Sequence, residues 1–173
     1  MAQLDFHVNF PGIVSETLAV ASNGTLSFVP MSPSDSVSFN KLNFYMSAGS
    51  NATFTLSIGL YSLTGSTLSI TNSMSRSITL SNFRGYVSLS ATSVAQNITP
   101  GTWWLGLLVS TGGNSSVAFV GQSFVNPGNA FPGGFIGGRM TDSTNALPAS
   151  YATSNLDVTG TDAMSVPTII LTA

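Results

Sequence analysis

The clearest pattern in the chain is a strict alternation of apolar and polar residues. Segment 53–61 (TFTLSIGLY) has an apolar residue at every second position, and these are Phe54, Leu56, Ile58 and Leu60. Side chains of a β-strand point alternately to its two faces, so we expect these four residues to share one buried face. The segment is therefore predicted to be a half-buried strand.

Other segments repeat this pattern, and none of ten or more residues has the 3.6-residue spacing of an amphipathic helix. Alternation recurs around residues 4–10, 25–29, 37–46, 68–70, 78–80, 87–89, 117–119 and 166–171. At Asn40–Lys41 the alternation changes phase, which predicts a bulge or a bend. Segment 103–109 (WWLGLLV) is apolar at nearly every position, which predicts a strand covered on both faces.

Turn-forming residues separate these segments. They occur at 23–24, 30–36, 48–50, 64–66, 99–101 and 112–114. Short strands divided at regular intervals by Gly, Pro, Asn and Ser are typical of antiparallel sandwiches. We therefore predict an all-β fold, an antiparallel β-sandwich of the jelly-roll type with about 8–10 strands. A single domain is expected to span residues 1–173.

One segment, 126–140 (NPGNAFPGGFIGGRM), differs from the rest and is too rich in Gly and Pro for a regular strand. We predict a long loop here. Its apolar anchors and its one cation make five interface or ligand-loop candidates: Phe131, Phe135, Ile136, Arg139 and Met140. A long loop of this kind either packs over the core of its own domain or contacts a partner, and both alternatives stay open.

Charged residues make up only 6% of the 173 residues, against about 25% in an average soluble domain. The four cations are scattered, which argues against a nucleic-acid partner and against an anionic membrane surface. The longest apolar run is far shorter than the ~20 residues of a spanning helix. The N-terminal residues lack the features of a signal peptide, so we expect synthesis in the cytoplasm, or export by a route that the sequence does not show.

A mean hydropathy of +0.34 accompanies this low charge. Weakly charged proteins with exposed apolar area tend to associate. We therefore expect part of the surface to be buried against other copies, and we predict a homotrimer.

Residues that could support catalysis or bind a metal form no recognisable pattern. The single histidine, His7, has no nearby partner in the sequence, and the six acids are scattered. Asp157 and Asp162 flank a short loop without the regular oxygen spacing of a calcium site. The chain has no cysteine, which removes disulfides and thiolate ligands. We predict a non-enzymatic protein with no catalytic residue, no cofactor and no metal.

Aromatic residues could serve as a sugar-stacking platform. The candidates are Trp103, Trp104, Tyr45, Tyr61, Tyr86 and Tyr151. Adjacent residues of a strand point to opposite faces, so at most one of the two tryptophans can serve a given surface. Packing in a core or an interface is the favoured interpretation for both tryptophans.

Two motifs resemble those of known proteins. Segment 98–107 (ITPGTWWLGL) resembles a strand entry of small jelly-roll domains on the exterior of tailed bacteriophages. Segment 146–150 (ALPAS), Leu156 and the final segment 166–171 (VPTIIL) are similar to the closing part of such decoration, head-spike and fibre domains. The resemblance covers the C-terminal half of the chain and implies a trimeric assembly on a virion, made in the host cytoplasm.

The leading hypothesis is a capsid-exterior structural protein, a decoration or cement protein or a short head spike. Its expected partners are its own copies, the major capsid protein and other virion proteins. No stem or coiled-coil segment is present in the sequence, so we expect attachment through the faces of the domain itself. The alternatives are a tail-fibre tip that binds host surface glycans and a free carbohydrate-binding module.

Overall fold

The computed structural model describes residues 6–7, 15–21, 24–31, 35–49, 51–90, 96–111, 117–124, 138–140, 146–155, 164–167 and 169–172. These residues contain 15 strands, and every strand pair is antiparallel. The predicted all-β antiparallel sandwich is therefore confirmed.

The structure has more strands than the 8–10 predicted, because seven short strands accompany eight strands of seven or more residues. The long strands are β2 (Ser15–Ala21), β3 (Thr25–Met31), β5 (Lys41–Ala48), β6 (Ala52–Thr64), β7 (Thr67–Leu80), β8 (Phe83–Ser90), β10 (Trp103–Thr111) and β11 (Val117–Phe124). The short strands are β1 (Phe6–His7), β4 (Val37–Phe39), β9 (Gln96–Ile98), β12 (Gly138–Met140), β13 (Ser150–Ala152), β14 (Met164–Pro167) and β15 (Ile169–Thr172). A 3₁₀ helix, η2, follows β13 at Thr153–Asn155.

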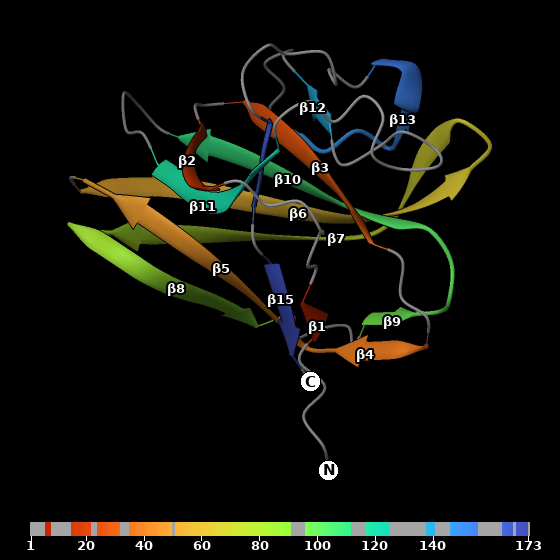
Figure 1. The fold of residues 1–173 in the computed structure, drawn as a ribbon, viewed down its shortest axis with the longest axis horizontal. Coiled ribbons are helices and arrows are strands. Elements are labelled where there is room, and N and C mark those ends of the chain that lie inside the picture. Colours follow the sequence, from red (N-terminus) through yellow and green to blue (C-terminus); the bar gives the residue numbers. More distant parts are fainter. Residues whose placement is uncertain are drawn as a thin grey trace.

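The strands form two main sheets; in Figure 1 most of β5 and β8 of sheet A lies below β6 and β7 of sheet B, whereas β2 and β11 of sheet A overlap sheet B in this view. Sheet A contains β8, β5, β15, β11 and β14, with β2 beside β11 and β1 beside β15. Sheet B has the order β12-β3-β10-β6-β7-β13. Strands β4 and β9 form a small separate ribbon.

The pairing of the strands is nested about the turn at Gly65–Ser66. Moving outward from this turn, β6 pairs with β7, β5 with β8, β4 with β9, β3 with β10 and β2 with β11. These ten strands thus pair as one antiparallel ribbon. Gly65 has a φ of 61°, a conformation that glycine adopts without steric cost, which explains the tight turn at its end.

The ribbon passes from sheet A to sheet B at a corner where both of its strands bend together. Ala48 pairs with Phe83 on one side of the corner, and Ala52 pairs with Leu80 on the other. A hydrogen bond from the Ser81 hydroxyl to the Asn51 side-chain oxygen joins the two bends. Two further pairings, β10 with β6 and β11 with β5, hold the folded ribbon closed.

The main core lies between the two sheets. It contains the four residues predicted from the alternation in segment 53–61, because Phe54, Leu56, Ile58 and Leu60 are all buried. The predicted break at Asn40 is also confirmed. A bend at this residue separates β4, which pairs with β9, from β5, which belongs to sheet A.

A second core covers the outer face of sheet B. Its buried members are Leu26, Phe28, Tyr61, Leu68, Trp104 and Leu108, and Leu63, Ile70, Leu147 and Tyr151 pack against them. The prediction that segment 103–109 is buried on both faces is confirmed, because Leu105, Leu107 and Val109 belong to the main core. Apolar side chains therefore line both sides of the central strand β10.

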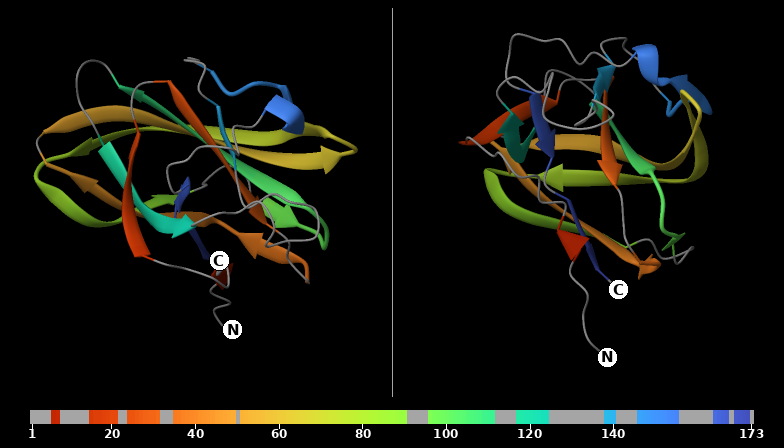
Figure 2. Two further views of the ribbon diagram at one scale, coloured as in Figure 1. Left: turned by 45° about the horizontal axis from the view of Figure 1, so that its top comes forward. Right: turned by 45° about the vertical axis from the view of Figure 1, so that its right-hand side comes forward.

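Segment 146–155 lies over this second core and is held there by backbone hydrogen bonds. The amide of Ile70 donates to the carbonyl of Ala149 at 3.0 Å, and the amide of Thr153 donates to the carbonyl of Ser66 at 2.8 Å. The far end of the β6–β7 hairpin curls toward this segment, as Figure 2 shows. The outer face of sheet B is consequently concave at this end.

A β-bulge in the β6–β7 hairpin explains the curl. It also determines which apolar residues of β7 face each core. Leu60 pairs with Asn72 and Tyr61 with Ile70, so Thr71 is the extra residue. Its hydroxyl donates to the Leu60 carbonyl at 2.9 Å. A bulge increases the twist of a ribbon, and the inserted residue reverses which face the following side chains occupy.

This reversal sorts the apolar residues of β7. Ile78 and Leu80 lie in the main core, whereas Leu68 and Ile70 contribute to the second core. All four have even residue numbers, so a regular strand would place them on one face. The single inserted residue decides which core receives each pair.

Two glycines make room for the largest side chain of the second core. Gly59 and Gly106 are cross-strand partners in β6 and β10. A Cβ atom at Gly59 would lie 2.6 Å from the Tyr61 ring carbon Cε2, and one at Gly106 would lie 2.7 Å from the same atom. The ring of Tyr61 therefore rests directly on the backbone of the two central strands.

We predict that Gly106→Ala destabilises the fold by about 1–3 kcal/mol, because the added methyl group displaces the buried Tyr61 ring. Urea unfolding followed by far-UV circular dichroism measures the change. Gly49→Ala is the matched control, since a Cβ at Gly49 meets nothing within 4 Å. Equal effects of the two substitutions would contradict the packing of Tyr61 on the glycine pair.

Candidate functional site

Of the Gly/Pro-rich segment 126–140, the structure describes only the backbone of residues 138–140. Phe131, Phe135 and Ile136 lie outside the described residues, and so do the side chains of Arg139 and Met140. The backbone at 138–140 departs from the predicted loop, because these residues form β12, and Arg139 and Met140 pair with Ser27 and Leu26 of β3. An edge strand needs only backbone groups to pair, which explains why a Gly-rich sequence can occupy this position. Whether the five residues form a contact stays a prediction.

The residues considered for catalysis or metal binding are not brought together among the described residues. His7 lies in β1 opposite Ile170, while Asp157 and Asp162 are outside the described part of the chain. Within the described part, no three His, Cys, Asp or Glu residues lie close enough to hold a metal ion.

A small cavity lies near one end of the main core. Its volume is about 20 Å³, and its lining includes Phe39, Leu42, Leu60 and Met74. Pockets for drug-sized ligands have volumes of about 300–1,000 Å³. This cavity has room for about one water molecule and is a packing gap rather than a ligand site.

The two tryptophans point to opposite faces of sheet B, as predicted. Trp103 packs against the main core, and its Nε1–H donates to the carbonyl of Thr99 at 2.9 Å. Trp104 is 2% exposed and belongs to the second core. Both side chains are therefore used for packing.

The four tyrosines are also divided between two places. Tyr61 is fully buried and donates its O–H to the Pro148 carbonyl at 2.9 Å. Tyr151 stacks on Phe28 with ring centroids 5.3 Å apart and donates to the Asn155 carbonyl at 2.9 Å. These two tyrosines fix segment 146–155 to sheet B, so they cannot share a platform with Tyr45 and Tyr86 on sheet A.

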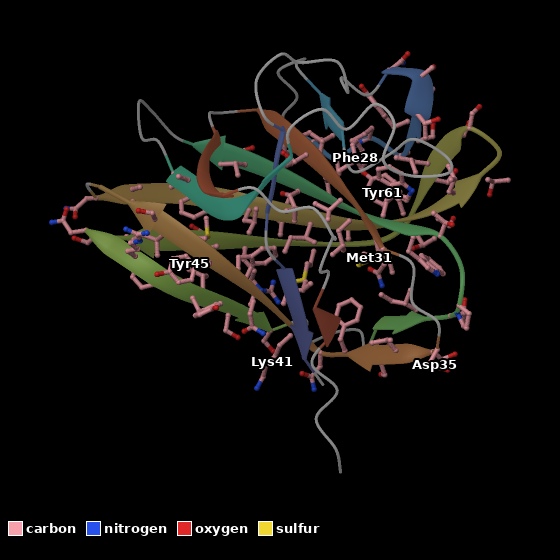
Figure 3. All side chains as sticks on the ribbon, viewed as in Figure 1. Phe28, Met31, Asp35, Lys41, Tyr45 and Tyr61 are labelled. Carbon is pink, nitrogen blue, oxygen red and sulfur yellow. The ribbon has the colours of Figure 1, made fainter. Side chains whose placement is uncertain are left out.

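Burial raises the pKa of Tyr61 to about 12, because the phenolate would lose its hydration in the second core. The phenol therefore stays protonated and keeps donating to Pro148 at all pH values below this range. In Figure 3, Tyr61 lies beside Phe28, well apart from Tyr45 on β5.

Tyr45 and Tyr86 form a cross-strand pair on the outer face of sheet A. Their ring centroids are 5.0 Å apart with an angle of 85° between the ring planes, an edge-to-face arrangement. Tyr86 is 62% exposed, and it is the one large hydrophobic side chain that is exposed among the described residues. The outer face of sheet A therefore presents an aromatic ring to solvent.

Six further residues share this face, in four rungs of cross-strand partners. The rungs are Ser47–Arg84, Tyr45–Tyr86, Asn43–Ser88 and Lys41–Ser90. We call these eight residues the β5–β8 face. Their strand neighbours Leu42, Phe44, Met46 and Leu89 point into the main core. The β5–β8 face therefore points away from the core and carries two cations and no acid.

The sequence contains a signal for this face that the search for chemical motifs missed. Polar residues alternate with core residues along both 41–48 and 83–90, and the polar set of each segment includes a tyrosine and a cation. The pairing of the two segments could not be inferred from alternation alone. Their register depends on the corner of the ribbon and on the turn at Gly65–Ser66.

Comparison with protein-family models finds no match, and comparison with curated proteins finds no relative. The resemblance to phage exterior domains thus rests on the quoted motifs alone. In the described residues, no helix has the length and apolar character needed to cross a membrane.

We predict that Tyr61→Phe removes a pH dependence of stability at alkaline pH. The pKa of this phenol is about 10 in the unfolded chain and about 12 in the folded one, so the unfolded state loses its proton first. The stabilisation is complete below about pH 10 and is lost as the pH rises toward about 12.

Urea unfolding at a series of pH values between 9 and about 11.5 measures this effect. The wild-type chain should lose stability more steeply with pH than Tyr61→Phe does. Ser75→Ala, an exposed substitution that removes no ionisable group, is the control and should keep the wild-type slope. Parallel slopes for wild type and Tyr61→Phe would contradict the burial of the phenol.

Proposed function

We propose that this protein is a non-enzymatic structural component of a bacteriophage virion, placed on the capsid exterior as a decoration or cement protein or a short head spike. We also infer that its sandwich is of the jelly-roll type. The nested strand pairing is the observation that carries both proposals.

The nested pairing supports the jelly-roll assignment because a jelly roll is a long antiparallel ribbon rolled into two sheets. Strands β2, β11, β5 and β8 would form one four-stranded sheet, and β3, β10, β6 and β7 the other. Four of the five pairs of the ribbon, all except β4–β9, and the two closing pairs β11–β5 and β10–β6 fit this arrangement. Viral capsid domains and lectins are common users of jelly rolls, and neither use requires a catalytic site.

The surface chemistry of sheet B agrees with a structural role. Beyond the second core, its outer face presents hydroxyl groups: Thr53, Thr55, Ser57, Ser73, Ser75, Ser77 and Thr79. Two cross-strand hydroxyl pairs are hydrogen-bonded, Thr53–Thr79 at 3.2 Å and Ser57–Ser75 at 3.0 Å. A surface hydrated by hydroxyls rather than by charges depends little on ionic strength, which suits a particle exposed to varied media.

Self-association as a homotrimer, and contact with the major capsid protein or other virion proteins, are parts of the same proposal. The two cores account for most of the described apolar side chains, so the positive mean hydropathy does not by itself require a subunit interface. The trimer therefore rests on the resemblance and on the low charge. Light scattering of the purified chain at micromolar concentration should give three times the monomer mass, and a monomer mass would contradict the trimer.

The capsid assignment predicts a difference in particle stability. Capsids of the encoding phage should retain their DNA to a higher temperature when they carry the protein than when its gene is deleted. Genome release measured with a DNA-binding dye during heating tests this, and adding back purified protein is the control. Identical release temperatures, with no copy of the protein detected on purified shells, would contradict the proposal.

A second candidate function is favoured by one observation, the exposed ring of Tyr86 on the β5–β8 face. A tail-fibre tip that binds host surface glycans, or a free carbohydrate-binding module, would use such a ring. Purified protein should then bind host cells or their envelope polysaccharide, and Tyr86→Ala should reduce the binding.

A further inference from the structure

We propose that the β5–β8 face is a binding surface for an acidic oligosaccharide, in which a sugar ring stacks on Tyr86 and a carboxylate or sulfate group pairs with Arg84. The proposal adds a ligand class to the second candidate function. It does not depend on the location of the protein in a virion, because it concerns only the side chains of two strands.

The Tyr45–Tyr86 pair supplies a preorganised stacking group. Tyr45 is half-buried and packs edge-to-face with Tyr86, which restricts the Tyr86 ring while leaving it 62% exposed. A side chain that is already restrained loses little entropy when it binds a ligand. The exposed aromatic ring is therefore ready to cover an apolar face of a sugar.

The four rungs of this face follow one another along the two paired strands and form a strip. Successive same-face residues of an antiparallel strand are about 6.8 Å apart, so the strip from Arg84 to Ser90 is about 20 Å long. Tyr86 lies in the second rung, Asn43 and Ser88 in the third, and Lys41 in the fourth. An extended chain of several linked sugars can follow such a strip, with amide and hydroxyl groups of the third rung near its hydroxyls.

The charge of the strip selects an anionic ligand. Arg84 lies one rung from Tyr86, and Lys41 lies two rungs away on the other side. None of the eight residues is acidic, although the chain as a whole has a net charge of −2. The planar guanidinium of Arg84 can bind a carboxylate or sulfate with two parallel hydrogen bonds, a geometry that lysine cannot offer.

A saccharide fits this chemistry better than a nucleic acid does. Non-specific binding of a single strand requires a continuous positive groove and several stacking aromatics. The β5–β8 face has two cations at opposite ends and one exposed ring, and six of its eight side chains are uncharged hydroxyl, amide or phenol groups. Uncharged polar groups match the hydroxyls that make up most of a sugar surface.

Isothermal titration calorimetry at low salt tests the proposal on the full chain. The probes are three acidic oligosaccharides, tetragalacturonate, a sulfated chondroitin tetrasaccharide and sialyllactose, with maltotetraose as the neutral counterpart. We expect at least one acidic probe to bind more tightly than maltotetraose. For that probe Tyr86→Ala should weaken binding by about tenfold or more, which corresponds to about 1.4 kcal/mol or more.

Three further variants separate the contribution of the Arg84 charge to binding from that of its planar guanidinium geometry. Arg84→Gln should reduce both the affinity and its salt dependence, whereas Arg84→Lys should restore the salt dependence but only part of the affinity. Ser75→Ala, an exposed substitution on the outer face of sheet B, is the matched control and should bind like the wild type. Unchanged unfolding curves for all of these variants exclude a folding defect as the cause.

Several outcomes would overturn the proposal. One is that no acidic probe binds at concentrations up to about 10 mM, which excludes even weak recognition. Others are binding that Tyr86→Ala leaves unchanged, equal binding of maltotetraose, and tighter binding of an oligothymidylate. A change of oligomer mass in Tyr86→Ala would instead assign the face to a contact between copies. None of these results bears on the capsid-heating experiment, so the two proposals fail separately.

Discussion

Sheet B buries apolar side chains on both of its faces, and the rest of the structure depends on this double burial. The inner face meets sheet A in the main core, and the outer face is covered at one end by segment 146–155. A chain with 6% charged residues has few groups that favour exposure. A second core gives its surplus of apolar residues a place within the protomer, where each fully buried large side chain contributes about 1.5–3 kcal/mol.

The second core is possible because the central strands allow close approach. Gly59 and Gly106 leave the backbone open at the point where the Tyr61 ring lies, and the Tyr61 hydroxyl reaches Pro148 in the covering segment. The bulge at Thr71 then turns the end of the hairpin so that Leu68 and Ile70 face the same cluster. The covering segment packs on the concave surface that the bulge produces, and the Tyr61 hydrogen bond holds the segment there.

This arrangement leaves two outer surfaces of different chemistry. The uncovered part of sheet B presents a row of hydroxyls, and the β5–β8 face presents Tyr86 between two cations. A hydroxyl surface is hydrated and has little affinity of its own, whereas an exposed, restrained aromatic ring beside an arginine is typical of a recognition surface. The two sheets therefore divide the tasks of stability and contact in the proposed functions.

The sequence by itself determined the local alternation and indicated seven of the eight long strands, whereas β2 was not among the predicted segments. Phe54, Leu56, Ile58 and Leu60 lie in one core as their spacing requires, and the opposite orientation of Trp103 and Trp104 follows from their being adjacent in a strand. The break at Asn40 was visible as a change of phase. These features depend on neighbouring residues only, so a linear pattern contains them.

Only the tertiary structure decided which residues share a surface when their positions in the apolar–polar alternation are equivalent. Leu68 and Ile78 have the same parity in one strand but lie in different cores, because one inserted residue, Thr71, reverses the faces. Tyr61 and Tyr86 were both candidates for a sugar-stacking platform, yet one is buried and the other is exposed. Arg84 and Tyr45 share the β5–β8 face although they are distant in the chain. Pairing between distant strands and the burial that it produces are non-local, and no short pattern specifies them.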